Sequence, residues 1–208
     1  MFITFEGPEG SGKSTQIQLL AQFLETQGYH VVQTREPGGT VIGDQIRHVL
    51  HDVANTEMVA TTEVLLYSAS RAQLVAQLIR PHLAAGNVVL CDRFADSTMA
   101  YQGYGRYLDH NMLTQLTQIA TGGLKPDLTI LLDIDVEEGL NRKKQGHTEM
   151  NRLDLEAISF HKRVRDGYHQ LAAAEPARWV IIDANRPVDA VQTAIQQAVY
   201  KKGLKIED

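Results

Sequence analysis

The sequence predicts an α/β fold in which helices cover a mostly parallel β-sheet. The short continuous apolar run at residues 88–91 is typical of a central strand in a parallel sheet, and residues 127–132 are expected to form another buried strand. They alternate with longer segments whose apolar residues recur every three or four positions, the spacing of a helix with one buried face. No linker, repeat or low-complexity segment divides the chain, so we expect one domain over residues 1–208.

The first half of the chain is expected to contain three strands, at residues 1–6, 29–33 and 88–91. Helical spacing predicts helices over residues 15–27, 41–50 and 63–85. Pro81 is expected to kink the last of these, because proline has no N–H to donate to the preceding turn. Gly28 is predicted to end the first helix as its C-cap, and residues 34–40 are predicted to form a turn-rich loop.

The second half is expected to hold helices at residues 97–102, 112–120, 136–144, 155–174 and 188–200, with strands at 127–132 and 179–182. In a parallel sheet, ligands bind at the carboxyl ends of the strands. That rule places the most reactive side chains along one edge: residues 7–14, Arg35, Glu36, Asp92, Arg93 and Asp133.

Residues 7–14 read G-P-E-G-S-G-K-S and match the phosphate-binding P-loop motif, between a predicted strand and a predicted helix. Glycines let backbone N–H groups turn toward a phosphate, and the helix adds its unpaired N–H groups and the positive end of its dipole. Lys13 can reach the outer phosphates, and the Ser14 hydroxyl can bind Mg²⁺. A tight glycine turn that binds nothing is the alternative, which the flanking strand and helix disfavour.

Charge and cysteine content limit the partners. The net charge of −5 opposes a broad nucleic-acid-binding surface. The single cysteine, Cys91, excludes a disulfide within the chain and fits a reducing compartment. No leader-like segment precedes the first strand, and no stretch approaches the roughly 20 apolar residues of a membrane helix. We therefore expect a cytoplasmic protein with neither a membrane nor a nucleic acid as partner.

Several charged side chains have two interpretations. Asp92 follows an apolar strand, where an acid holds Mg²⁺ in P-loop proteins, but Asp is also a common N-cap. Arginines bind phosphate bidentately, although a lone arginine is usually a solvated surface charge. Arg35, Arg47, Arg71 and Arg93 lie on four separate segments, and a kinase, unlike a nucleotide switch, needs a second anionic pocket for its acceptor.

A basic, polar segment surrounds residues 145–151. Arg142, Lys143, Lys144 and Arg152 flank it, and a mobile basic flap can close on phosphates and exclude water. The alternative is a solvated helix end, where cations are favoured by the helix dipole. Glu9 is unusual inside a phosphate-binding loop, and we expect it to bind a sugar hydroxyl or to orient water on Mg²⁺.

These residues resemble one family, the thymidylate kinases, over the whole chain. The similar segments are FEGPEGSGKST at 5–15, TREPGG at 34–39, LLYSASR at 65–71, CDRFADSTMAYQGYGR at 91–106, KPDLTILLD at 125–133 and NRLD at 151–154. The resemblance implies a P-loop NTPase fold with a five-stranded parallel sheet flanked by helices, a short helical lid at about 142–154, and a homodimer. It also implies the reaction ATP + dTMP → ADP + dTDP with Mg²⁺, a step of dTTP synthesis.

The resemblance further implies roles for individual residues. The ATP-binding residues would be Gly7, Pro8, Glu9, Gly10, Ser11, Gly12, Lys13, Ser14 and Thr15. The metal-binding residues would be Ser14 and Asp92, and the catalytic ones Lys13, Asp92, Arg93, Arg142 and Arg152. The dTMP-binding residues would be Glu9, Arg35, Glu36, Arg47, Tyr67, Arg71, Arg93, Thr98, Tyr101 and Gln102.

Within that set, Arg35 resembles the arginine that grips the dTMP phosphate, and Arg71 the one that hydrogen-bonds the base. Tyr67 stands where the family usually has a phenylalanine stacked on thymine, and Thr98 where serine is common. The loop has no arginine between Gly7 and Gly12, and in members of that kind the lid supplies the catalytic cation.

Three alternatives stay open from the sequence. A kinase for another nucleoside monophosphate would share the P-loop but not Tyr67, Arg71, Thr98 and Gln102 together. A GTPase switch should show N-K-x-D for guanine, and the chain has no such tetrapeptide. A non-catalytic nucleotide-binding module would not need the lysine, the acid and the arginines.

Overall fold

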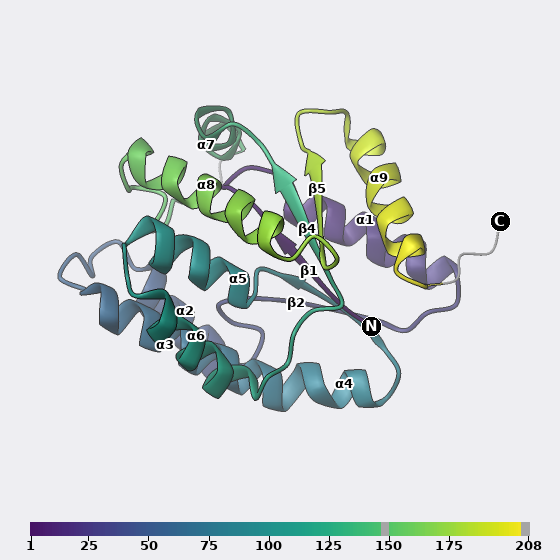
Figure 1. The fold of residues 1–208 in the computed structure, drawn as a ribbon, viewed down its shortest axis with the longest axis horizontal. Coiled ribbons are helices and arrows are strands. Elements are labelled where there is room, and N and C mark those ends of the chain that lie inside the picture. Colours follow the sequence, from purple (N-terminus) through teal and green to yellow (C-terminus); the bar gives the residue numbers. More distant parts are fainter. Residues whose placement is uncertain (147–149, 205–208) are drawn as a thin grey trace.

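The structure, a computed structural model, describes residues 1–146 and 150–204. Within them, five strands form one parallel sheet in the order β2-β3-β1-β4-β5 (Figure 1). The strands are β1 (Phe2–Glu6), β2 (Val31–Arg35), β3 (Val88–Asp92), β4 (Leu128–Asp133) and β5 (Trp179–Asp183). The predicted parallel α/β fold is confirmed, and the α/β architecture, five strands included, matches the expectation drawn from the resemblance.

The described helices cover both faces of this sheet (Figure 1). They are α1 (Lys13–Thr26), α2 (Val41–His51), α3 (Ala60–Leu74), α4 (Arg80–Ala84), α5 (Ala95–Thr98), α6 (His110–Thr121), α7 (Val136–Gln145), α8 (Ile158–Ala174) and α9 (Val188–Lys201), with π-helical stretches η1 (Val75–Ile79) and η2 (Met99–Gly105). No helix among the described residues is both long enough and apolar enough to cross a membrane.

Strand alternation divides the core between the two faces. Side chains of one parity, such as Ile3 and Phe5 of β1, pack with α1 and α9 in the largest apolar cluster. Side chains of the other parity face the opposite side, where Phe2 packs with η1. Thr4 and Glu6 follow Phe2 on that face, and Glu6 contacts α8. The carboxyl group of Glu6 is thereby buried between the sheet and α8.

The register brings the carboxyl ends of the strands together. Arg35 of β2 pairs with Asp92 of β3, and Asp92 pairs with Phe5 of β1. Asp133 of β4 lies opposite Asp183 of β5. The predicted edge of charged residues therefore exists, with β1 and its loop at its centre.

Several helices differ in their bounds or regularity from the expectations, and α3, for example, begins at Ala60 instead of residue 63. The predicted helix 63–85 contains π-helical η1 before Pro81, and the Arg80 N–H bonds back to Val75 O instead of the usual carbonyl. The predicted helix 97–102 is part of a longer helical segment, α5 followed by the π-helical η2, which continues to Gly105. Glycine has a low helix propensity, but the ring of Phe160 packs against Gly105 and the segment continues to that residue. Helix α8 begins at Ile158, since residues 151–154 form a turn closed by the Asn151 side chain.

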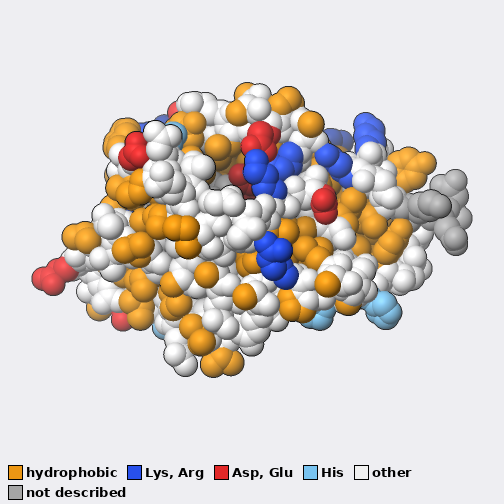
Figure 2. Space-filling model, turned by 60° about the horizontal axis from the view of Figure 1, so that its bottom comes forward, with side chains coloured by type: hydrophobic (Ala, Val, Ile, Leu, Met, Phe, Trp, Pro, Cys, Tyr) orange, Lys and Arg blue, Asp and Glu red, His pale blue; other side chains and the backbone are white. Residues whose placement is uncertain are grey.

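Apolar side chains remain exposed on the helices at the lower edge of Figure 1. Val41, Ile42 and Val49 of α2, Leu65 of α3 and Ile119 of α6 are each at least 46% exposed. Figure 2 brings this side of the molecule forward and shows many hydrophobic side chains, with few charged ones, over its lower part.

Candidate active site

The P-loop joins β1 to α1 in the conformation that its glycines permit. Gly7, Gly10 and Gly12 all have positive φ angles, of 137°, 70° and 85°. A Cβ at Gly10 would overlap the backbone of Gly139 in α7, and a Cβ at Gly139 would overlap the backbone of Glu9. The two backbones can approach this closely because both positions are glycine, and the approach brings α7 beside the loop.

The Lys13 side chain folds back onto the P-loop. Its Nζ donates to Gly7 O at 3.1 Å, to Pro8 O at 3.0 Å and to Ser11 Oγ at 3.3 Å. Burial, with Arg93 nearby, lowers its pKa to about 8, so the ammonium form still predominates at pH 7. The lysine is therefore a buried cation whose present partners are neutral oxygens that a phosphate can replace.

Ser14 and Asp92 lie together at the mouth of the loop. The Ser14 hydroxyl donates to Asp92 Oδ2 at 3.0 Å, which places two oxygen ligands of the type that Mg²⁺ prefers side by side. Within residues 1–146 and 150–204, no group of three or more His, Cys, Asp or Glu side chains could enclose a metal alone. This donor set fits a magnesium ion that also takes oxygens from phosphates and water.

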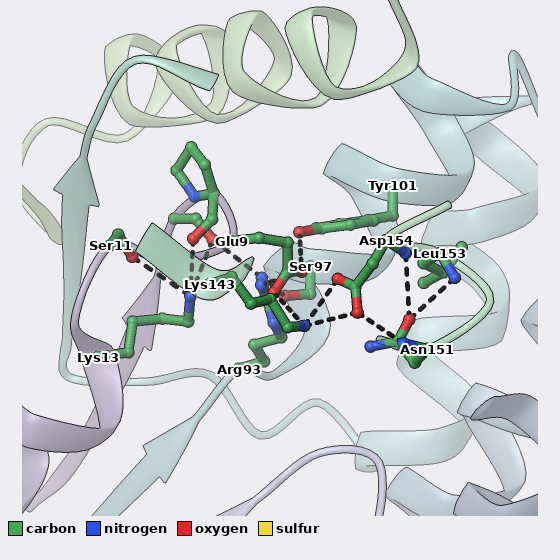
Figure 3. A network of polar contacts seen from close by, with 12 residues as sticks. Glu9, Ser11, Lys13, Arg93, Ser97, Tyr101, Lys143, Asn151, Leu153 and Asp154 are labelled. Carbon is green, nitrogen blue, oxygen red and sulfur yellow. Dashed lines mark hydrogen bonds and ion pairs between the residues drawn. The ribbon is translucent and has the colours of Figure 1, made fainter. Parts of the chain in front are cut away.

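Arg93 and Glu9 form the centre of a buried polar network (Figure 3). Arg93 Nη2 donates to Glu9 Oε1 at 2.7 Å, and the Tyr101 hydroxyl donates to the same oxygen at 2.9 Å. Burial alone would raise the pKa of Glu9, but Arg93, Lys13 and Lys143 outweigh it and hold that pKa well below its ordinary value. Three cations thus surround one carboxylate, the arrangement expected where an anionic substrate arrives.

The basic segment 142–154 contributes Lys143 to this network. Lys143 Nζ lies 3.4 Å from Glu9 Oε2 and 2.6 Å from Asp154 Oδ2 (Figure 3). Residues 147–149 of the predicted lid lie outside the described residues. Lys143 was not among the expected catalytic residues, because a lysine in a basic run gives no sign of which cation turns inward.

Arg142 and Arg152, the expected lid cations, have other partners in this structure. Arg142 bonds to Glu138, to Ala184 O and to the Asn185 side chain, although it still lines the cavity described below. Arg152 pairs with the buried carboxylate of Glu63 and donates to Leu50 O at 3.2 Å. The structure therefore brings Lys143 to the network, and does not bring Arg152 there.

On the other side of the network lies a second set of polar side chains. Arg71, which is 1% exposed, donates from Nε to Glu36 Oε2 at 2.8 Å and from Nη2 to Phe94 O at 3.1 Å. Its Nη1, Glu36 Oε1 and Thr98 Oγ1 are buried without a hydrogen-bond partner among the described residues. Unpaired buried polar atoms are costly, so their presence here indicates a ligand that completes them.

The remaining expected acceptor residues lie around the same space. Gln102 donates from Nε2 to Glu63 Oε1, which leaves its amide oxygen for a ligand. Arg47 donates to Pro37 O at 2.9 Å, and Arg35 pairs with Asp44 at 3.2 Å while about half of its side chain stays exposed. Arg35 is thus held loosely enough to turn toward an anion.

One cavity of about 510 Å³ connects the two sets. Its P-loop side is formed by Glu9, Gly10, Ser11, Gly12, Lys13, Ser14 and Thr15. Its far side is formed by Arg35, Glu36, Arg47, His51, Tyr67, Arg71, Thr98, Tyr101 and Gln102, and Asp92, Arg93, Ser97, Arg142 and Lys143 are also in its wall. Gly7, Pro8 and Arg152 are not in the wall, although the carbonyls of Gly7 and Pro8 hold Lys13.

Comparison with known proteins decides the family. The family model described as thymidylate kinase matches residues 5–195. The chain belongs to the thymidylate kinase family. The thymidylate kinases of Roseiflexus castenholzii and Trichlorobacter lovleyi are 51% and 53% identical to it, covering 96% and 97% of this chain and 92% and 98% of their own lengths. A crystal structure of thymidylate kinase from Ehrlichia chaffeensis matches with a TM-score of 0.78 and 35% identity, covering 96% of this chain and 98% of that one.

Three residues at the site of this thymidylate kinase family member could not be recognised as site residues from the sequence. His51 lines the cavity, and burial with the nearby Arg47 lowers its pKa to about 4, so its imidazole is neutral at pH 7. Ser97 and Tyr168 contact Arg93. Tyr168 is 162 residues from Glu6 along the chain, so only folding brings the two together.

Proposed function

We propose that this thymidylate kinase family member transfers the γ-phosphoryl group of ATP to dTMP, giving ADP and dTDP. The observation that carries the proposal is the single cavity that runs from the P-loop to the unpaired polar atoms of Arg71 and Thr98. A nucleotide switch needs only the P-loop side of that cavity, whereas a kinase also needs the far side to bind its acceptor. The full set of site residues named from the resemblance remains part of this proposal.

The far half of the cavity suits thymine. Position 4 of thymine carries a carbonyl, which accepts hydrogen bonds, whereas cytosine carries an amino donor there. Arg71 has donors alone, and its unpaired Nη1 can donate to that carbonyl. Tyr67 adds an aromatic surface, which stabilises any pyrimidine by stacking.

The acceptor phosphate is already ionised at pH 7, so the reaction needs no general base. Phosphoryl transfer depends on positioning and on neutralising the charge of the transferred group. Lys13, Arg93 and Lys143 line the cavity near Glu9 and supply positive charge there. Ser14 and Asp92 would hold Mg²⁺, which supplies charge neutralisation on the ATP phosphates when it is bound.

We also propose that segment 142–154 is the lid of a single kinase domain. The Gly10–Gly139 approach anchors the start of α7 beside the P-loop, and Lys143 extends from that helix toward Glu9. Closure of such a segment keeps water from competing as the phosphoryl acceptor. The closed position of the lid then decides which cation reaches the transferred group: Arg142, Lys143 or Arg152.

The exposed apolar side chains of α2, α3 and α6 support a homodimer. Side chains of this kind on three neighbouring helices form the type of surface that a second copy covers. The free, buried thiol of Cys91 is compatible with the reducing cytoplasm, which we propose as its location. Light scattering of the purified chain checks the dimer, with a monomer at micromolar concentration as the contradicting result.

The decisive experiment measures ADP formation with a panel of nucleoside monophosphates in the presence of ATP and Mg²⁺. We expect dTMP to give the highest kcat/KM. A preference for another monophosphate would indicate a kinase with a different acceptor. Nucleotide hydrolysis without transfer would indicate a nucleotide switch, and no ADP formation at all would indicate a non-catalytic nucleotide-binding module.

A further inference from the structure

Three side chains that belong to neither the P-loop nor the predicted lid support Arg93, two by direct contact and the third, Glu6, through those two. Glu6 ends β1, Ser97 lies in α5, and Tyr168 lies in α8. We name these three residues the Glu6 cluster. Two of them, Glu6 and Tyr168, are fully enclosed by protein.

The hydrogen bonds of the Glu6 cluster have a defined direction. Arg93 has donors alone, and its Nη1 donates to Tyr168 Oη at 3.0 Å and lies 3.5 Å from Ser97 Oγ. Both hydroxyls therefore present lone pairs to the arginine and must send their protons elsewhere. Glu6 Oε2 accepts from Ser97 at 2.6 Å and from Tyr168 at 2.8 Å. A carboxylate at this point orients both hydroxyls toward Arg93.

The same carboxylate also holds the backbone that carries Arg93. Arg93 has a φ of 68°, a left-handed conformation that is unfavourable for a residue with a side chain. Glu6 Oε1 accepts the N–H of the next residue, Phe94, at 2.8 Å. Backbone and guanidinium are thus both fixed by Glu6, directly in one case and through two hydroxyls in the other.

We propose that Glu6, Ser97 and Tyr168 are positioning residues that set the orientation of the Arg93 guanidinium for phosphoryl transfer. The proposal rests on the phosphoryl-transfer function proposed above. Arg93 contacts the reacting groups, and the Glu6 cluster acts through it. Tyr168 belongs to the helix that follows the predicted lid, so the cluster also joins that part of the chain to the reaction centre.

The first test removes one hydroxyl. Tyr168→Phe keeps the ring in its apolar surroundings and deletes the acceptor for Arg93, and Tyr104→Phe is the matched control on η2. With whichever monophosphate the wild type phosphorylates, at about pH 8, we expect kcat of Tyr168→Phe to fall about tenfold or more, the size of effect seen when a transition-state donor is displaced. The dissociation constants for ATP and the acceptor should change far less, and Tyr104→Phe should match the wild type.

The second test asks whether the effect passes through Arg93. In an Arg93→Lys background, Tyr168→Phe should cause little further loss of kcat, because residues that act as one unit are not additive. Glu6→Gln should also lower kcat, since its amide group donates to the hydroxyls and reverses their direction. If Tyr168→Phe does not fold, Ser97→Ala replaces it in both backgrounds. We expect Ser97→Ala to lower kcat in the wild type and to cause little further loss in Arg93→Lys.

A folded Tyr168→Phe or Ser97→Ala variant with kcat within twofold of the wild type would overturn the proposal. Equal losses of kcat in the wild-type and Arg93→Lys backgrounds would also overturn it, because the cluster would then act elsewhere. The identity of the preferred acceptor tests the proposed function, and the comparison between variants tests the Glu6 cluster, so the two can fail separately.

Discussion

The ammonium group of Lys143 lies 2.6 Å from Oδ2 of Asp154, whose side chain is completely enclosed by protein (Figure 3). Asp154 Oδ2 also accepts the N–H of Asn151 at 2.7 Å, so the carboxylate ties α7 to the turn before α8. Lys143 contacts Glu9 of the P-loop as well. One lysine thus connects the two ends of the predicted lid to each other and to the P-loop.

Lys143→Met should lower the free energy of unfolding by about 3 kcal/mol, because it leaves the Asp154 carboxylate buried without a cation. Urea denaturation measures the change. Lys144→Met, at an exposed position of the same helix, is the control and should stay within about 0.5 kcal/mol of the wild type. Adding Asp154→Asn to Lys143→Met should recover part of the loss, and a double variant no more stable than the single one would contradict the explanation.

Lys13→Ala should give a folded protein that transfers phosphate at least about a hundredfold more slowly, since a well-placed cation contributes roughly 3 kcal/mol to transition-state stabilisation. Steady-state ADP formation measures the effect, and Lys125→Ala, an exposed lysine far from the cavity, is the control. Near-normal turnover in Lys13→Ala would remove this lysine from the mechanism.

Arg35→Ala should raise KM for dTMP much more than KM for ATP, because the acceptor phosphate loses its bidentate partner. The loose pairing of Arg35 with Asp44 predicts little loss of stability. Initial rates with each substrate varied in turn separate the two constants. An equal rise in both would mean that Arg35 has a structural role or serves both substrates.

Arg71→Ala should lose activity with dTMP while its activity with dCMP stays low or rises, so that the preference between the two collapses. The reason is that the unpaired Arg71 Nη1 suits the thymine carbonyl and would remain unpaired beside a cytosine amino group, at a cost of roughly 1–3 kcal/mol. Turnover of both nucleotides is compared in the wild type, Arg71→Ala and the control Arg80→Ala. Equal losses with both acceptors would move the preference to Thr98 and Gln102.

The stability contributed by Glu6 should depend on pH. Burial and then the nearby Asp96 raise its pKa from an ordinary 4.5 to about 7, although Arg93 opposes the shift. Since the folded state holds this proton more tightly than the unfolded chain, the contribution is fully present below about pH 4.5 and is lost as the pH rises through 7.

Urea denaturation of the wild type and Glu6→Gln between pH 4.5 and 8 measures this contribution. The difference in unfolding free energy between the two should move against the wild type by about 3 kcal/mol over that interval. Subtracting one unfolding free energy from the other cancels the contributions of the other titrating groups, which both proteins share. A difference that does not vary with pH would show that the carboxyl titrates alike in the folded and unfolded chains.

The order of elements and the phosphate-binding loop were determined by the sequence alone. Apolar runs such as 88–91 are typical of central parallel strands, which are buried on both faces, and the observed strand bounds lie within two residues of those predicted. The P-loop at 7–14 could be predicted because its conformation is local: the glycines with positive φ and the Lys13 side chain that bonds to Gly7 O all belong to one short segment. The alignment of Arg35 and Asp92 at one edge follows from the rule for parallel sheets.

Only the tertiary structure decided which charged side chains meet. Arg142, Lys143 and Arg152 all flank one polar segment, yet Lys143 faces Glu9 while Arg152 pairs with Glu63, because helix rotation and the turn at Asn151 set their directions. The Glu6 cluster joins residues from β1, α5 and α8 that no local pattern relates. Local periodicity reports which face of an element is buried, whereas the partner of a buried charge depends on how distant elements pack, and that information exists only in the folded chain.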